Sequence, residues 1–254
     1  MAISNAFSLA GKTALITGAA SGLGYAMAQC MIANGGSVII ADLDFEKAKK
    51  AAAELGEKAY YSQFDVSKTA DTEAWVAQLL KDHPRIDILV NNAGNHCKKP
   101  IEQMTVADFE SVLDVHVVGA FALTKALVPH MKQNGKGCIL FTASMTSFLG
   151  QPFVTGYAAA KSAYLGLIRG LATELGADGI RVNGIAPGWI DTPMLRKAIE
   201  GDDVRKNKIL GRTPMKCFGT PEDIGWAACY LASEAAKFVN GQVLVVDGGA
   251  LIGF

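Results

Sequence analysis

Short apolar runs alternate with longer helical stretches along almost the whole of this chain. The runs are rich in Ile, Val and Leu and show little period-two alternation, as in Ile86-Asp87-Ile88-Leu89-Val90. Strands that are buried on both faces have this pattern, and they occur in parallel sheets covered by helices. The alternation therefore predicts an α/β fold with a single-domain, doubly wound, mostly parallel sheet.

The expected elements can be placed by residue number. Strands are expected at 12–17, 37–42, 59–64, 86–91, 137–142, 181–185 and 242–246, and helices at 22–34, 45–55, 69–81, 106–132, 155–175, 192–209 and 221–232. Because no linker or repeat interrupts this pattern, we expect one domain over residues 1–254. The polar stretch 191–217 is either a helical insertion that covers a substrate or a plain surface excursion.

Charge and cysteine content exclude several classes of protein. The chain has 24 basic and 24 acidic residues, so it is a poor candidate for binding nucleic acid or an anionic membrane. Its 5 cysteines are widely spaced and odd in number, which favours reduced thiols over a disulfide framework or a zinc site. No signal peptide and no apolar run long enough for a membrane span are visible, so a cytoplasmic protein is expected.

A glycine-rich turn follows the first expected strand. Gly18, Gly22 and Gly24 are spaced as G-x-x-x-G-x-G between that strand and the first expected helix. In this context the glycines allow a tight turn, a close approach of a diphosphate to the backbone, and close packing of helix on sheet. The alternative is an ordinary glycine-rich connection without a ligand.

An acidic residue ends the second expected strand. Asp42 lies 18 residues beyond Gly24, where a carboxylate accepts hydrogen bonds from ribose hydroxyls and repels a 2′-phosphate. No Lys or Arg occurs directly after Asp42 before Lys47, so NAD(H) is expected in preference to NADP(H). The alternative role, capping the helix that starts near Phe45, suits Asp44 better than Asp42.

Three residues in the second half of the chain carry acid–base chemistry. Ser144 follows the fifth expected strand, and Tyr157 and Lys161 are four residues apart, so they share one helix face. A nearby ammonium lowers the pKa of a tyrosine, which is about 10 in water, so we expect Tyr157 to exchange a proton with an alcohol or ketone. Ser144 is expected to hydrogen bond the reacting oxygen. The alternative is an exposed helix face without chemistry.

Taken together, these motifs resemble the short-chain dehydrogenase/reductase family. The glycine loop at 17–24, Asn91-Asn92-Ala93-Gly94, the Ser144/Tyr157/Lys161 set and Pro187-Gly188 occur in the family's order, from about residue 11 to residue 249. The resemblance implies a seven-stranded sheet of order 3-2-1-4-5-6-7, a nicotinamide cofactor, no catalytic metal, and a homotetramer formed through the helices at 106–132 and 155–175.

The resemblance also implies roles for individual residues. Asp65 and Val66 are expected at the adenine, Asn92 at the cofactor site, and Ile190 and Thr192 at the carboxamide. The full set expected to bind the cofactor is Gly18, Ala20, Ser21, Gly22, Leu23, Gly24, Asp42, Asp65, Val66, Asn92, Ala93, Gly94, Tyr157, Lys161, Pro187, Gly188, Ile190 and Thr192.

One position departs from the family pattern. His116 stands where the family usually has an asparagine that completes an Asn-Ser-Tyr-Lys tetrad. Three hypotheses remain open: His116 holds a water as asparagine does, it titrates within the proton relay, or the backbone does the work and the side chain is secondary. His116 is therefore included with Ser144, Tyr157 and Lys161 as a catalytic candidate.

The substrate is expected to be a small alcohol or ketone. Lys98 and Lys99 follow the Asn-Asn-Ala-Gly turn and either attract a carboxylate or belong to a solvated loop, while His96 and Cys97 lack partner ligands for a metal. Residues expected to shape the pocket are Ser144, Met145, Thr146, Gln151, Phe153, Tyr157, Trp189, Met194 and Arg212.

The runs at 211–214 and 238–249 are similar to gluconate 5-dehydrogenase-like members of the family. We therefore expect an NAD(H)-dependent oxidoreductase of a sugar acid or polyol. The alternatives are a 3-oxoacyl or hydroxysteroid reductase of the same family and, from another class, a cofactor-binding regulatory protein that has lost catalysis.

Overall fold

The computed structural model describes residues 5–253, except the side chains at 194 and 198, and its centre is one parallel sheet. The strands are β1 (Thr13–Thr17), β2 (Ser37–Asp42), β3 (Ala59–Gln63), β4 (Ile88–Asn91), β5 (Gly137–Thr142), β6 (Ile180–Pro187) and β7 (Val243–Val246). Their order is β3-β2-β1-β4-β5-β6-β7, and each neighbouring pair is parallel. The predicted fold class and strand order are confirmed.

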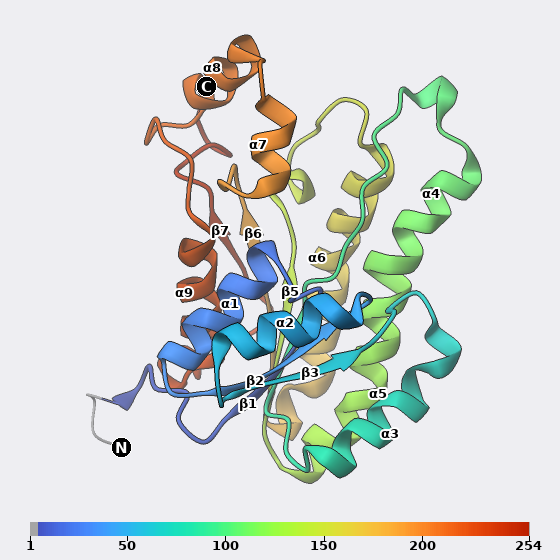
Figure 1. Ribbon diagram of the computed structural model, residues 1–254, viewed down its shortest axis with the longest axis vertical. Helices are drawn as coiled ribbons and strands as arrows, with labels where there is room; N and C mark the ends of the chain where they lie inside the picture. Colours follow the sequence, from blue (N-terminus) through green and yellow to red (C-terminus); the bar gives the residue numbers. More distant parts are fainter. Residues whose placement is uncertain (1–4, 254) are drawn as a thin grey trace.

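Helices cover both faces of the sheet (Figure 1). They are α1 (Gly22–Ala33), α2 (Phe45–Leu55), α3 (Thr72–Asp82), α4 (Val106–Leu113), α5 (Ala120–Gln133), α6 (Thr155–Leu175), α7 (Pro193–Ile199), α8 (Asp203–Arg212) and α9 (Pro221–Ala232). The inner strands β1, β2, β4, β5 and β6 have no exposed face because alternate side chains enter different cores. In β1, Ala14 and Ile16 pack with α1, α2 and α9, whereas Leu15 packs with α3, α5 and α6.

Helices α1 and α9 lie close together on one face of the sheet. Gly225 of α9 is the contact point, because a β-carbon there would lie 2.5 Å from Cys30 Sγ and 2.8 Å from the carbonyl oxygen of Ala26. The absence of a side chain at Gly225 therefore sets the distance between the two helices.

The single helix expected at 192–209 is wrong, since the structure divides it into α7 and α8. Gly201 between them has φ +70°, a left-handed conformation that glycine adopts readily. The Asp202 side chain then accepts a hydrogen bond from the amide of Arg205 at 2.8 Å and starts α8. Together α7 and α8 stand at one end of the molecule, near the chain's carboxyl terminus (Figure 1).

The helix expected at 106–132 is present but contains a wider turn. Helices α4 and α5 are joined by a π-helical segment, η4 (Asp114–Gly119), which includes His116. Within residues 5–253, the continuous stretch Val106–Gln133 is long and apolar enough to cross a membrane by length and composition. The core helix of a soluble protein passes the same test, and this helix packs on α3 and α6.

Replacing Gly225 with Ala should destabilise the fold. The added methyl group has no room between α9 and α1, and overpacking of this kind typically costs about 1–3 kcal/mol. Gly211→Ala is the matched control, because that helical glycine has open space around it and should stay neutral or gain up to about 1 kcal/mol. Urea unfolding of both variants measures the difference, and equal stabilities would contradict the tight α1–α9 contact.

Candidate active site

The glycine loop adopts the tight turn that its sequence predicts. Gly18 and Gly22 have positive φ, +62° and +57°. A β-carbon on Gly18 would lie 2.8 Å from Ala93 Cα, and one on Gly24 would lie 2.6 Å from the Asn92 side chain. Open space surrounds Gly22, where a β-carbon would meet nothing within 4 Å. The loop is therefore pressed against the end of β4 on one side and leaves room for a ligand beside Gly22.

The amino terminus of α1 faces this loop. Ser21 precedes α1 in an extended conformation, its side chain forms no capping hydrogen bond, and the first turn of α1 has no acidic residue. Leu23 and Gly24 belong to that first turn, whose amides have no partner within the helix. Amides in this position bind phosphate groups, so the loop fits the diphosphate of a dinucleotide.

Asn92 connects three strand ends below the loop. Its Nδ2 donates to the carbonyl oxygens of Thr17 and Gly18 at 3.0 and 3.1 Å, and its Oδ1 accepts from the Thr142 hydroxyl at 3.2 Å. The Thr17 hydroxyl oxygen accepts from the amides of Asn92 and Ala93, each at 3.0 Å. Asn92 thus holds β1, β4 and β5 in register where a cofactor would lie.

Asp42 lies beside the glycine loop, as predicted. One carboxylate oxygen accepts from the Ala20 amide at 3.1 Å, and the other accepts from the Asp44 amide at 3.2 Å. The expected helix cap at Asp44 is also present, since its side chain accepts from the Lys47 amide. Asp65 follows β3 and accepts two hydrogen bonds from Ser67.

The remaining residues expected at the cofactor lie at the carboxyl ends of β3 and β6. Val66 is buried after β3, and Pro187 ends β6. A β-carbon on Gly188 would lie 2.5 Å from Asp247 Cβ, so this turn passes closely over the end of β7. Ile190 is buried beside Gly219, and the Thr192 hydroxyl accepts from the Leu195 amide at 3.3 Å to start α7.

Ser144, Tyr157 and Lys161 meet above β5. Ser144 follows β5, is buried, and accepts a hydrogen bond from the Thr146 amide at 3.1 Å. Tyr157 and Lys161 project from α6, with the Lys161 ammonium 5.5 Å from the centre of the Tyr157 ring. Lys161 is buried and donates to the carbonyl oxygen of Thr142. The predicted catalytic residues are thus brought together.

One electrostatic expectation is corrected by the structure. Burial raises the pKa of Tyr157 above its usual value, while a hydrogen bond with Ser144 opposes this rise. Burial also lowers the pKa of Lys161 to about 7, so its charge is only partial near neutral pH. The expected lowering of the Tyr157 pKa by Lys161 is absent, because desolvation acts on both groups and the ammonium is bonded to Thr142.

His116 packs edge-on against Tyr157, with ring centres 5.5 Å apart. Its Nε2 lies 2.9 Å from the carbonyl oxygen of Asn95 and 3.2 Å from the Asn95 amide nitrogen, so one ring nitrogen holds that backbone. A β-carbon at Gly94 would overlap the imidazole, so only glycine fits there. Burial, followed by repulsion from Lys161, lowers the pKa of His116 to about 3, which argues against the titrating hypothesis.

His96 makes a contact with Tyr157 that the sequence did not predict. Its ring stacks on Tyr157 with centres 4.1 Å apart and planes 27° from parallel. Burial and the nearby Lys161 lower the His96 pKa, although the side chain keeps an exposed edge. The available signal was its position two residues after the Asn-Asn-Ala-Gly turn, in a loop that runs past Tyr157.

Several of the residues expected at the substrate lie shortly after Ser144 in the chain. Met145 and Thr146 are buried beside Ser144, while Gln151 is half-buried on the following loop. The carbonyl oxygen of Phe153 accepts from the Lys99 amide at 2.9 Å, which joins that loop to the one carrying His96.

The other residues expected at the substrate differ in whether they already have a partner in the protein. Lys99 forms an ion pair with Asp108 at 2.8 Å. Lys98 is exposed and has no partner among the described residues. Arg212 donates to the carbonyl oxygen of Ala250, and the indole nitrogen of Trp189 is buried without a partner in the described structure. The Met194 side chain lies outside the described part. Residues 5–253 contain no cluster of three metal-ligating side chains.

Comparisons with known proteins agree with this geometry. The sequence model of a family described as enoyl-(acyl carrier protein) reductase matches residues 18–250. The 5-keto-D-gluconate 5-reductase of Escherichia coli K12 is 38% identical over 249 residues, which cover 97% of this chain and 98% of the relative. The chain therefore belongs to the short-chain dehydrogenase/reductase family, and it is an oxidoreductase of that family.

Solved structures are similar over nearly the full length. A gluconate 5-dehydrogenase from Burkholderia cenocepacia, in complex with NADP and tartrate, has a TM-score of 0.94 and 34% identity, with 98% of this chain and 99% of that chain covered. A 7α-hydroxysteroid dehydrogenase complexed with NADH and 7-oxo glycochenodeoxycholic acid has a TM-score of 0.92 and 37% identity, with 98% of each chain covered. The relatives thus act on different alcohols and contain different nicotinamide cofactors.

His116→Asn should make the fold more tolerant of acid. The folded protein keeps His116 neutral down to about pH 3, whereas the unfolded chain binds the proton below about 6.5, so wild-type stability falls as pH drops through this window. At about 1.4 kcal/mol per pH unit, the variant should gain about 2 kcal/mol relative to wild type between pH 7.5 and pH 5.

Urea unfolding at both pH values measures this change. His83→Asn is the control, because that histidine directly follows α3, is only half-buried and should therefore show a smaller effect. A stability difference that is the same at both pH values would show that His116 takes up a proton in the folded protein.

Proposed function

We propose that this protein interconverts a secondary alcohol and a ketone on a sugar acid or polyol, of the gluconate/5-keto-gluconate type, with NAD(H). The observation that carries the proposal is an excess of basic side chains in the segments proposed to border the site. Residues 191–212, which follow β6, contain six basic and four acidic side chains, with Arg196 paired to Asp191 at 2.7 Å, and Lys98 is exposed on the loop that carries His96. Such an excess favours a carboxylate-bearing substrate, and relatives named for 5-keto-gluconate and gluconate support the same class.

The chemistry follows from the positions of the catalytic side chains. A bound nicotinamide supplies hydride transfer. Tyr157 exchanges the proton with the substrate oxygen, and its raised pKa keeps it protonated and ready to donate during ketone reduction. Ser144 hydrogen bonds that oxygen, and Lys161 supplies partial positive charge beneath the tyrosine.

We assign His116 a positioning role. Its imidazole touches the edge of Tyr157 and binds the backbone of Asn95, so it fixes both the tyrosine and the loop that carries His96 and Lys98. The other substrate contacts proposed are Met145, Gln151, Trp189 and Arg212.

The proposed cofactor site extends along the carboxyl edge of the sheet. The glycine loop binds the diphosphate, Asp65 and Val66 lie at the adenine, and the residues after Pro187 lie at the nicotinamide. Preference for NAD(H) is supported by Asp42, whose carboxylate sits at the loop with Asp44 beside it, while Lys47 is paired with Asp44. The Asp42 carboxylate, which has no cation partner in the described structure, opposes a 2′-phosphate at this corner.

We also propose the wider organisation of the protein. The chain forms one domain in which residues 191–217 act as a cover over the substrate, with Gly201 as the bend between α7 and α8. It assembles as a homotetramer, to which the exposed Val118 and Phe121 of the 106–132 helix offer apolar surface. It acts in the cytoplasm.

A hydroxysteroid or 3-oxoacyl reductase is the second candidate, favoured by exposed Phe148 and Phe153 beside the site. The close arrangement of Ser144, Tyr157 and Lys161 argues against the alternative of a catalytically impaired regulatory protein.

A substrate screen tests the proposed reaction. Gluconate, related hexonates and polyols with NAD⁺, and 5-keto-gluconate with NADH, should show a change in absorbance at 340 nm, with hexonates preferred over a bile acid or an acyl thioester. Tyr157→Phe should reduce turnover by at least about 100-fold, the usual scale of a lost general acid, with NADH binding retained. Turnover of only the steroid or the thioester would contradict the substrate class.

Cofactor preference has a separate test at Asp42. Wild type should have a higher kcat/KM with NADH than with NADPH, and Asp42→Ser should shift that ratio towards NADPH by about tenfold or more, about 1.4 kcal/mol. Asp82→Ser is the matched control, because that exposed carboxylate ends α3, away from the glycine loop, and its loss should leave the ratio unchanged. A wild-type preference for NADPH would contradict the role of Asp42.

A further inference from the structure

A cavity lies at the opposite edge of the sheet from the candidate active site. Its volume is about 500 Å³, and its walls are the starts of β1, β4, β5 and β6 together with the segment that follows α9. Sites for small molecules have volumes of roughly 300–1,000 Å³. We call this space the amino-edge cavity, since parallel strands present their amino ends there. None of the residues assigned to the proposed reaction lines it.

Positive charge is concentrated in the amino-edge cavity, although the chain as a whole has no net charge. Five cationic side chains and two carboxylates line it: Lys12, Arg85, Lys136, Arg181 and Lys237, with Asp87 and Glu234. They come from five separate parts of the chain, so the fold, and not one basic segment, brings them together. The cavity thus carries an excess of three positive charges.

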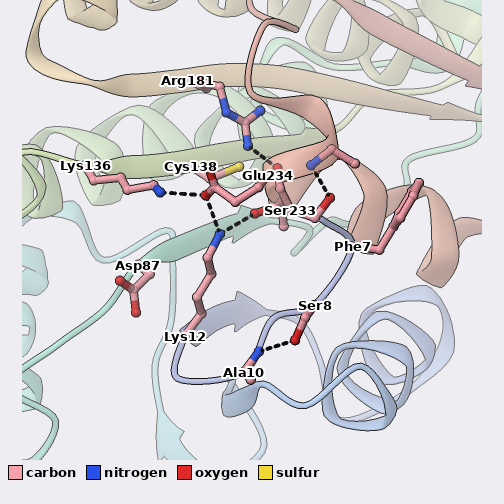
Figure 2. A network of polar contacts seen from close by, with 12 residues as sticks. Phe7, Ser8, Ala10, Lys12, Asp87, Lys136, Cys138, Arg181, Ser233 and Glu234 are labelled. Atoms are coloured by element: carbon pink, nitrogen blue, oxygen red, sulfur yellow. Dashed lines mark hydrogen bonds and ion pairs between the residues drawn. The ribbon is translucent and has the colours of Figure 1, made fainter. Parts of the chain in front are cut away.

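One carboxylate lies between two ammonium groups (Figure 2). Glu234 accepts from Lys12 at 3.3 Å and from Lys136 at 2.5 Å, and Lys136 is the main cause of the lowered pKa of Glu234. Lys12 also donates to the carbonyl oxygen of Ala232 at 3.1 Å. Glu234 therefore balances only one of its two partners.

Two further cations have no carboxylate partner. Arg181 donates to the carbonyl oxygens of Leu231, Ser233 and Val239 at 2.6, 3.3 and 3.3 Å, and these neutral acceptors leave its charge uncompensated (Figure 2). The ammonium of Lys237 forms no ion pair or hydrogen bond with any described residue. Arg85, by contrast, is paired with Asp87 at 2.8 Å, so this pair adds no net charge.

An aromatic ring stands at the rim beside these cations. Phe238 follows Lys237, lines the amino-edge cavity and is 100% exposed. A large apolar side chain that is fully exposed next to a cationic cavity offers a contact surface for the carbon frame of a bound molecule.

We propose that the amino-edge cavity binds a compact organic or inorganic anion with at least two negative charges, of the phosphate or polycarboxylate class. The anion supplies negative charge to Lys136, Lys237 and Arg181, because Glu234 is the one carboxylate that pairs with Lys136 and it is shared with Lys12. The site is independent of the proposed reaction, because the active site lies at the other edge of the sheet.

Calorimetric titration of the full-length protein tests the proposal. Pyrophosphate and citrate serve as probes, with NADH or NADPH in excess so that a phosphate site in the glycine loop is filled. One anion should bind per chain, and affinity should fall as salt is added. Stronger binding of pyrophosphate identifies a phosphate site, and stronger binding of citrate identifies a polycarboxylate site.

Charge variants locate the binding site. Lys237→Glu should weaken binding about tenfold or more, since it replaces an attractive charge with a repulsive one, and Lys237 is exposed and makes no contact that folding needs. Lys49→Glu on α2 is the matched control and should bind as wild type does. Lys136→Gln should also weaken binding, while Glu234 keeps Lys12 as its partner. The proposal is overturned if neither probe binds, or if Lys237→Glu and Lys136→Gln bind as tightly as the wild type.

Discussion

The close contact between the glycine loop and the end of β4 is the constraint on which the site depends. Asn92 donates to the carbonyl oxygens of Thr17 and Gly18, and a β-carbon at Gly18 or Gly24 would collide with the neighbouring backbone or with Asn92 itself. This contact sets the position of the loop against β1, β4 and β5. It also places the amino terminus of α1 at the same sheet edge as Ser144, so the proposed cofactor site and the proposed proton transfer share one edge.

Burial controls the electrostatics of that edge. Lys161 and His116 both lie near Tyr157, and desolvation moves both towards their neutral forms, with pKa values of about 7 and about 3. Burial also favours the neutral form of Tyr157, because it raises the pKa of the phenol. The protein alone therefore presents a nearly neutral set of groups, which suits protonated Tyr157 as a donor. A charge added nearby by a ligand acts strongly there, because little water screens it.

Much of this organisation is readable in the sequence because it depends on local patterns. Continuous apolar runs predicted the strands, and the spacing of Ser144, Tyr157 and Lys161 predicted their meeting above β5. The division of 192–209 was missed, although Gly201-Asp202 carries the signal of a bend followed by a helix cap. The stacking of His96 on Tyr157 was missed because it depends on the path of a loop, which no periodicity describes. The direction of the Tyr157 pKa shift also required the structure, since it follows from burial.

The π-helical turn η4 has a consequence for how the 106–133 helix tolerates change in length. Such a turn accommodates one residue more than a regular α-helix over the same rise, so α5 is rotated about its axis relative to α4. If one residue were removed from this turn, the helix would continue as a regular α-helix. Either α4 would then rotate away from α6, or α5 would rotate away from α3. His116 occupies the widened turn, so its presence at Tyr157 is tied to an insertion in the helical repeat as much as to its own chemistry.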